Sequence, residues 1–234
     1  MIKKTCWLIS RLFQNFFLQV IKRIEILKYI KTHDVRKLQL GSGPIVLDSW
    51  LNTDLYGRFT PKGIVLPLNL TKRFPFKSNT FDYIFSEHVI EHLTYEKGCH
   101  MLNESFRILK PGGRIRIATP DIKFFIDLYS KNKTSSQKKY IIWSVDNCLP
   151  HIKIYKDVFV INNSFRAWGH KFIYDFPTLK YALKKIGFIN IKKCEIGKSS
   201  STNFQNIESH GKFVCEFFNK LETFIIEATK PYSI

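Results

Sequence analysis

The stretch LQLGSG, from Leu38 to Gly43, places two glycines around a serine directly after an apolar run. Glycine has no side chain and tolerates positive φ, so such a turn lets the backbone approach a ligand closely. The full dinucleotide-binding pattern is absent, because Val46 stands where the third glycine is expected. Asp54 ends the next apolar stretch, where its carboxylate can accept hydrogen bonds from both hydroxyls of a ribose. Together the turn and Asp54 predict a ligand of the adenosine type.

The interval between Gly41 and Asp54 is shorter than the roughly 20 residues typical of dinucleotide folds. Little or no helix fits between the two strands, and a pyrophosphate needs the N-terminus of such a helix. The spacing therefore argues against NAD and favours a ligand without phosphates.

The stretch HVIEH, from His88 to His92, permits three interpretations. Either histidine can act as a general base, since the pKa of imidazole lies near 7. The pattern H-x-x-E-H is also a zinc signature, but zinc needs a further protein ligand and nothing in the sequence localises one. In the third interpretation both histidines are structural. We expect no metal site and take His88 and His92 as the candidate catalytic residues.

Short apolar runs alternate with helical patterns from Lys37 onward, as in an α/β protein with a mainly parallel sheet. KPGG, from Lys110 to Gly113, predicts a tight turn in which Gly112 has positive φ. Further strands are expected in FINIKKCEI and TFIIEATK, and a helix from Asp175 to Gly187. Residues from about 121 to 175 show no sustained period, and we interpret them as a lid or insertion.

Residues 1–36 are predicted to form a basic amphipathic helix. One interpretation lays this helix on an anionic membrane. The other, which we favour, packs its apolar stripe on the domain or on a second subunit. The stripe consists of Phe13, Phe16, Phe17, Val20, Ile21, Ile24 and Leu27.

Composition bounds the location and the partners. The chain of 234 residues has 37 Lys and Arg against 19 Asp and Glu, a net charge of +18 that favours polyanions or acidic surfaces unless it reflects compositional bias. The 5 cysteines are scattered, and no run reaches the roughly 18 apolar residues of a membrane span. We expect a cytoplasmic protein, with peripheral contact at the inner face of the membrane as an alternative.

The order of these motifs resembles the class I S-adenosylmethionine-dependent methyltransferases, particularly those of the small-molecule and surface-polysaccharide type. The resemblance rests on LQLGSG, WLNTD, LPLNLTKRFPFKSNTFDYIFSEHVIEHL and RILKPGGRIRIATPD, within residues 37–121, and extends loosely through AWGHKFIYD, LKKIGF and FIIEATK. It implies a Rossmann-like, mainly parallel seven-stranded sheet with helices on both faces, its last strand antiparallel, in a methyltransferase domain spanning 37–234.

The resemblance also implies how S-adenosylmethionine would be held. Gly41, Ser42 and Gly43 would pass under its methionine part, and Asp54 would bind its ribose. Asn69 stands where the family commonly has an acidic residue near the adenine, and Leu70 would flank the ring. Glu87 would lie near the transferred methyl. Gln39 departs from the acidic residue often seen there, but its oxygen can still accept from the amino group of the cofactor.

The acceptor implied is a small molecule or a glycan or lipid-linked precursor, and the lysine-rich region from Lys131 to Lys198 suggests a phosphorylated one. Asp121 and His170 are candidates to border its pocket, and His88 or His92 would act if an acceptor hydroxyl must lose its proton. An RNA methyltransferase and a non-catalytic cofactor-binding module are the alternatives. The sequence leaves the oligomeric state open.

Overall fold

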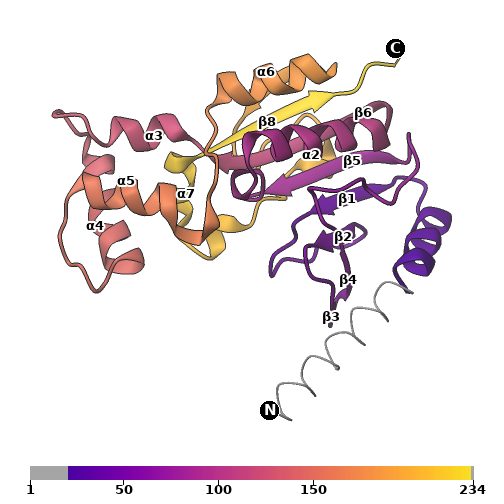
Figure 1. Ribbon diagram of the computed structural model, residues 1–234, viewed down its shortest axis with the longest axis horizontal. Coiled ribbons are helices and arrows are strands. Elements are labelled where there is room, and N and C mark those ends of the chain that lie inside the picture. The colour runs from indigo at the N-terminus through magenta and orange to yellow at the C-terminus, as the bar shows by residue number, and fades with distance from the viewer. Residues whose placement is uncertain (1–20, 233–234) are drawn as a thin grey trace, which may run out of the picture.

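A computed structural model describes residues 21–232. Its centre is an eight-stranded sheet in the order β3-β4-β2-β1-β5-β6-β8-β7 (Figure 1). The strands are β1 (Lys37–Leu40), β2 (Leu51–Asp54), β3 (Arg58–Thr60), β4 (Gly63–Pro67), β5 (Phe81–Glu87), β6 (Leu109–Pro120), β7 (Ile189–Cys194) and β8 (Thr223–Thr229).

Five strands of the sheet, β4, β2, β1, β5 and β6, run parallel, whereas β8 is antiparallel to both of its neighbours. The expected α/β class and the antiparallel last strand are confirmed. The predicted count of seven is one too few, because β3 forms an antiparallel hairpin with β4. A strand of three residues is too short to show an alternating pattern, so β3 has no signal in the sequence.

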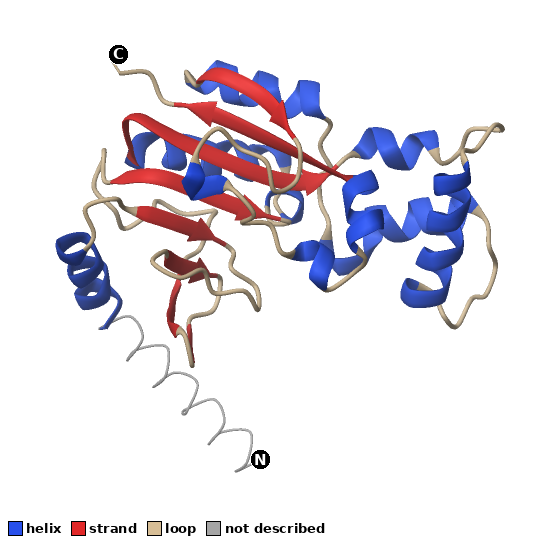
Figure 2. Ribbon diagram, turned by 180° about the vertical axis from the view of Figure 1, so that it is seen from behind, coloured by secondary structure: helices blue, strands red, loops and turns tan. Residues whose placement is uncertain are grey.

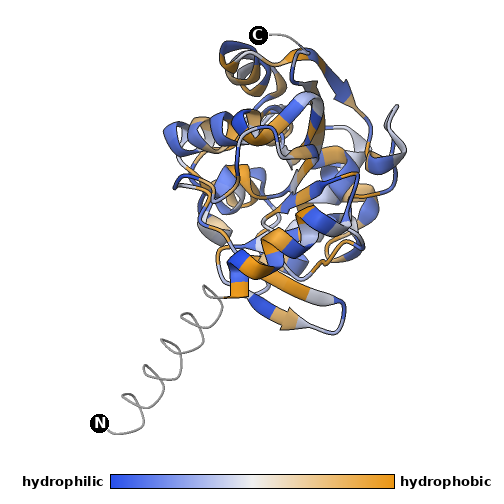
Figure 3. Cartoon of the chain, turned by 90° about the vertical axis from the view of Figure 1, so that its right-hand side faces the viewer, coloured by the Kyte–Doolittle hydropathy of each residue, from blue (hydrophilic) through white to orange (hydrophobic). Residues whose placement is uncertain are grey.

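Helices α2 (Tyr95–Ile108) and α6 (Phe176–Ile186) pack against the main hydrophobic core beside the sheet. Figure 3 shows polar and apolar residues alternating along the helices, as one buried face requires. Asp175 caps the start of α6 by accepting a hydrogen bond from the Thr178 amide, and Gly187 ends it with φ +113°. The predicted helix between Asp175 and Gly187 is therefore confirmed.

Helices were predicted on both faces of the sheet, but an irregular segment covers the face opposite α2 and α6. There Phe85 packs in a cluster with Trp50, Phe204 and Ile207, the last two from the polar segment that precedes β8. The connection from Gly43 to Leu51 is too short for a helix, and this irregular segment covers the apolar surface instead.

The region after Pro120 forms three helices, α3 (Ile122–Asp127), α4 (Ser135–Cys148) and α5 (Asp157–Arg166), with α7 (Glu216–Glu222) beside them. They share a separate small core and lie beyond the ends of β5 and β6 (Figures 1 and 2). We call α3, α4, α5 and α7 the cap. The limits of the insertion, about 121–175, remain a prediction. One sequence signal for a helix was the capping box of Thr134 and Gln137 at the start of α4.

Residues 21–32 are helical, but Ile24 and Leu27 of the predicted stripe do not face the core. Ile26 and Tyr29 are buried in the main core, whereas Ile24 and Leu27 are 59% and 60% exposed. Packing of the stripe on the domain is therefore wrong for Ile24 and Leu27, whereas packing on a second subunit stays a prediction. The stripe members before residue 21 lie outside the described residues. Within 21–232, no helix is long and apolar enough to cross a membrane.

Candidate functional site

Two adjoining cavities, of about 420 and 480 Å³, open at the carboxyl ends of the parallel strands. This is the edge where α/β sheets bind their ligands. Both cavities are lined by Gly41, Gly43, His88 and His92. The first continues under the cap, and the second extends along Asp54. We call them the cap cavity and the Asp54 cavity. Their shared lining makes them two parts of one cleft.

The glycine turn forms the wall between the two parts. Gly41 and Gly43 have φ of +65° and +49°, and a Cβ on Gly41 would lie 2.4 Å from a methyl carbon of Val89. Only glycine fits this backbone without strain. Gln39, on the strand before the turn, is buried and lines the cap cavity, and its Oε1 has no hydrogen-bond partner within the described chain. An amino group entering the cleft would supply the missing donor.

The Asp54 carboxylate lines the second cavity together with Asn69 and Leu70. One of its oxygens accepts from the Leu55 amide at 2.7 Å, and the other faces the Arg58 guanidinium at 3.2 Å. Arg58 also donates to Ser42 Oγ at 3.1 Å and to the carbonyl of Gly43. A ligand that reaches Asp54 therefore competes with Arg58 for the carboxylate.

Glu87 connects the strand end to the polar segment before β8. Its carboxylate accepts hydrogen bonds from the amides of Ser209 and His210, at 2.9–3.0 Å. Burial raises the pKa of Glu87, and these two amides offset part of that rise. Glu87 lines the cap cavity, as expected for a residue near the transferred methyl, but much of its accepting capacity holds the Ser209–His210 backbone in place.

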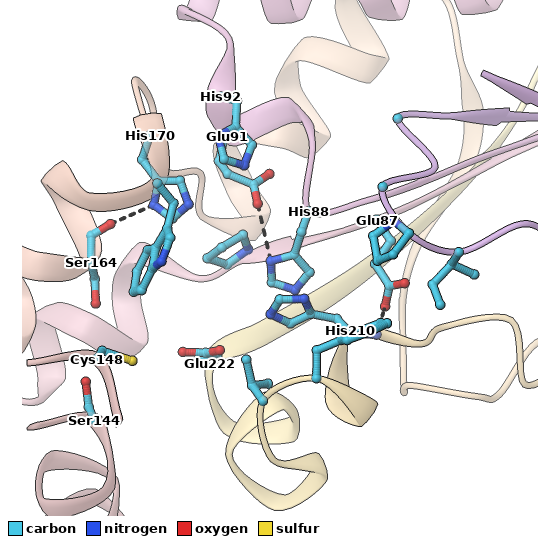
Figure 4. A pocket seen from close by; sticks show the side chains of 18 of the residues that line it. Glu87, His88, Glu91, His92, Ser144, Cys148, Ser164, His170, His210 and Glu222 are labelled. Atoms are coloured by element: carbon cyan, nitrogen blue, oxygen red, sulfur yellow. Dashed lines mark hydrogen bonds and ion pairs between the residues drawn. The ribbon is translucent and has the colours of Figure 1, made fainter. Parts of the chain in front are cut away.

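His88 has positive φ (+49°), and both of its ring nitrogens are engaged. Nδ1 lies 3.3 Å from Glu91 Oε1, Nε2 lies 3.1 Å from Thr223 Oγ1, and the ring stacks on His210 at 3.7 Å. Burial opposes the charged form, but the hydrogen bond and charge of Glu91 raise the pKa of His88 overall. Figure 4 shows His88 turned toward Glu91. Both nitrogens would have to release their partners before the ring could act on a ligand.

His92 and His170 lie side by side in the cap cavity, with ring centroids 4.9 Å apart (Figure 4). The carbonyl of Glu91 accepts from the amides of Lys171 and Phe172, at 2.8 and 3.1 Å, which fixes the His170 segment beside the turn that carries His92. His170 Nδ1 donates to the carbonyl of Ser164 at 2.7 Å, so Nε2 carries no proton in the neutral ring. Burial lowers the pKa of His170.

The cap and the segments next to it supply lining residues that were not predicted from the sequence. Phe125, Tyr140, Trp143 and Glu222 come from the cap, and Trp168 and His210 come from the segments that follow α5 and precede α7. The Tyr140 hydroxyl donates to the Glu222 carboxylate, whose pKa is raised by burial. Glu222 had a signal: it directly precedes an antiparallel strand, whose amino end lies at the ligand-binding edge. The cap aromatics had none, because the approach of α4 to the sheet depends on tertiary packing.

Asp121 lines neither cavity. Its side chain accepts from the Lys123 amide at 3.1 Å and caps the start of α3. The expected place of Asp121 at the acceptor pocket has no support in this geometry, although its neighbour Pro120 does line the cap cavity.

The methyltransferase domain family matches residues 58–117 of the sequence. This segment includes β4, β5 and most of β6, at the centre of the site. The chain therefore matches this family over 60 of its 234 residues. It is a class I methyltransferase, an enzyme class whose methyl donor is S-adenosylmethionine, on a Rossmann-like, mainly parallel sheet.

The chain is also similar to solved structures of low identity. An S-adenosylmethionine-dependent methyltransferase from Archaeoglobus fulgidus is 16% identical, and the match covers 93% of this chain and 94% of that chain with a TM-score of 0.48. An S-adenosylmethionine-dependent methyltransferase from Mesorhizobium loti is 15% identical, and the match covers 83% of this chain and 90% of that chain with a TM-score of 0.49. A phosphoethanolamine N-methyltransferase from Haemonchus contortus, solved with phosphomonomethylethanolamine and S-adenosylhomocysteine, is 16% identical. The match covers 90% of this chain and 53% of that chain with a TM-score of 0.42. No curated protein matches the sequence.

Proposed function

We propose that this methyltransferase transfers the methyl group of S-adenosylmethionine to a hydroxyl of an uncharged small molecule or glycan precursor bound under the cap. The observation that carries the proposal is the continuity of the two cavities through Gly41, Gly43, His88 and His92. A donor in the Asp54 cavity and an acceptor in the cap cavity would meet at this shared wall.

The donor half of the proposal assigns the adenosine to the Asp54 cavity. Asp54 would accept from the ribose hydroxyls in place of Arg58, with Asn69 and Leu70 beside the adenine. The methionine part would pass Gly41 and Gly43 toward Gln39, whose unpartnered Oε1 would accept from the amino group. Glycine at the turn allows this close approach of backbone and ligand.

The acceptor half rests on the lining of the cap cavity. Aromatic rings from Phe125, Tyr140, Trp143 and Trp168 provide flat apolar surfaces, such as the faces of a sugar ring pack against. No Lys or Arg lines this cavity within residues 21–232. The lysine-rich region therefore gives no reason to propose a phosphorylated group on the part of the acceptor that enters this cavity. The cavity lining also lacks the basic side chains that would bind the backbone of an RNA substrate.

The reaction needs alignment more than it needs functional groups. An acceptor oxygen attacks the methyl carbon, the bond between that carbon and the sulfonium sulfur breaks, and the hydroxyl proton leaves. The products are a methyl ether, S-adenosylhomocysteine and a proton. Of the two candidate catalytic histidines, His92 faces the acceptor space with His170, whereas His88 is engaged by Glu91 and Thr223.

A screen for released S-adenosylhomocysteine tests this function. Acceptors should include simple glycosides, nucleotide sugars, lipid-linked sugars and RNA, each with the full chain. We expect turnover with an uncharged saccharide. Turnover with RNA alone would overturn the proposal, and tight cofactor binding without turnover on any acceptor class would favour the non-catalytic module.

A further inference from the structure

We infer that Glu91, His92 and His170 form a binding site for a divalent transition-metal ion at the boundary between the donor and acceptor parts of the cleft. Each of the three offers one ligand atom, and these atoms lie within 4.8 Å of one another. All three residues line the cap cavity, and His92 also lines the Asp54 cavity. No metal was expected from the sequence, because HVIEH points to no further ligand on a second element. His170, 78 residues beyond His92, is that ligand.

The geometry requires only small side-chain adjustments to bind an ion. Two ligand atoms at bond lengths near 2.1 Å around one tetrahedral ion lie about 3.4 Å apart. The three ligand atoms now lie within 4.8 Å of one another, and rotation of the two imidazole rings can shorten these distances to the separation required by an ion. The backbones are already fixed, since the Glu91 carbonyl accepts from the amides of Lys171 and Phe172.

The groups behind the three ligands have the arrangement typical of metal sites. A metal-bound histidine usually donates its second ring nitrogen to a carbonyl or carboxylate. His170 does so through Nδ1 to the Ser164 carbonyl, at 2.7 Å, which leaves Nε2 as the ligand. Glu91 is fully buried, and its Oε2 accepts from Thr119 Oγ1 at 3.1 Å. His88, 3.3 Å from the other carboxylate oxygen, orients it from behind and is not part of the ligand set.

The donor set selects the kind of ion. Two imidazoles and one carboxylate are the protein ligands of many catalytic zinc sites, and the same set binds Fe²⁺ and other first-row ions. Mg²⁺ and Ca²⁺ prefer oxygen ligands and fit poorly. Three protein ligands would leave at least one coordination position open to a ligand, and all three residues line the cap cavity.

The open position gives the ion a role that rests on the proposed function. An acceptor hydroxyl bound there would lose its proton to solvent more easily, because a divalent ion lowers the pKa of bound hydroxyl groups. The oxygen would then attack the methyl carbon as described above. In this arrangement His92 acts as a ligand and positions the acceptor, and no protein base is required.

Metal binding by the untagged, full-length protein tests the inference independently of any acceptor. After dialysis against a chelator, Zn²⁺ is titrated by calorimetry and Co²⁺ by its visible absorption. We expect one ion per chain, and a loss of at least about a hundredfold in Zn²⁺ affinity in His92→Gln and in His170→Gln. The matched control is His210→Gln, which alters a histidine of the same cavity outside the ligand set and should keep the parent affinity.

Two results would overturn the site: no stoichiometric binding of Zn²⁺ or Co²⁺ by the folded parent protein, or unchanged affinity in both ligand variants. The parent Co²⁺ spectrum needs no variant, so a variant that fails to fold does not remove the test. Calorimetry with S-adenosylhomocysteine on the same samples separates the two proposals. One ion bound without cofactor binding would support the site and overturn the function. Cofactor binding without an ion would overturn the site, and the acceptor screen would then decide the function.

Discussion

Asp54 is the residue that best separates cofactor binding from chemistry. Its carboxylate would accept from the ribose in the ground state and the transition state alike, so Asp54→Ala should weaken S-adenosylhomocysteine binding by about 1.5–3 kcal/mol. Turnover at saturating cofactor should fall much less. Calorimetry and initial rates measure the two effects.

Arg58→Ala provides the control for Asp54→Ala. The pair of Arg58 and Asp54 is partly exposed, so its loss should cost little stability, while it frees the carboxylate for a ligand. Cofactor affinity in Arg58→Ala should therefore equal or exceed that of the parent. If Asp54→Ala binds the cofactor as tightly as the parent, Asp54 does not bind the ribose.

His92 should show the opposite pattern. It faces the acceptor space, so His92→Gln should reduce turnover by about a hundredfold or more and leave cofactor affinity nearly intact. This expectation holds whether His92 takes a proton or binds an ion, since both roles concern the acceptor alone. Full methyl transfer by the variant would show that catalysis depends on positioning by other residues.

Single residues differ in how far the sequence reveals them. Gly41 and Asp54 carry local signals, a turn that only glycine fits and an acid at a strand end, and both line the cleft. His170 was named from its surroundings, but its contact with His92 depends on hydrogen bonds between segments about 80 residues apart. Periodicity and motif spacing contain no information about such a contact.

At the scale of elements, β6 and β8 are joined by a buried ionic cluster. Arg116 on β6 is fully buried and donates to Glu227 on β8 at 2.6 Å and also to Glu208. Burial alone would raise the pKa of Glu227, but hydrogen bonds from Ser199 and Arg116 and the charges of Arg114 and Arg116 lower it overall. This cluster therefore makes the pairing of the two strands sensitive to acid.

The sign of that sensitivity follows from the direction of the shift. The unfolded glutamate titrates near pH 4.3, and the folded one below that. The contribution of Glu227 to stability is complete above the unfolded pKa and is lost as the pH falls through the folded pKa. Glu227→Gln should be less stable than the parent by about 3 kcal/mol at pH 7, and the difference should shrink toward pH 3. Thermal unfolding across this range measures it, and a constant difference would contradict the assignment.

The elements themselves were predictable where local rules agree. The parallel strands have apolar runs, and α6 has an acidic cap and a terminal glycine. Gly112 has the positive φ expected of KPGG, at +78°, but the predicted tight turn before the strand is wrong, because KPGG lies within β6, where the register with β5 shifts. The face that carries Phe85 was not predictable, because Phe204 and Ile207 lie in a polar segment without period. Their burial is decided by the absence of a helix above that face.

At the scale of the whole molecule, the positive charge is separated from the cap cavity, although Lys171 lines the Asp54 cavity. The net charge is +18, yet the lining of the cap cavity contains no Lys or Arg within the described residues. Positive charge on the outer surface would attract an anionic partner over distances of about a Debye length. It has no direct part in acceptor binding under the cap.

The helix at residues 21–32 is where charge and exposed apolar surface meet. Ile24 and Leu27 point away from the core, so replacing both by serine should leave the melting temperature nearly unchanged. If this face contacts an anionic membrane, the double variant should sediment less with phosphatidylglycerol vesicles than the parent does, and about 1 M salt should reduce parent binding by screening.

The matched control is Ile26→Ala, a buried position on the same helix, which should lower stability by about 2–4 kcal/mol and retain vesicle binding at temperatures below its melting transition. Equal sedimentation of the parent and the double variant would exclude these two side chains from membrane contact and leave the exposed stripe to a second protein chain.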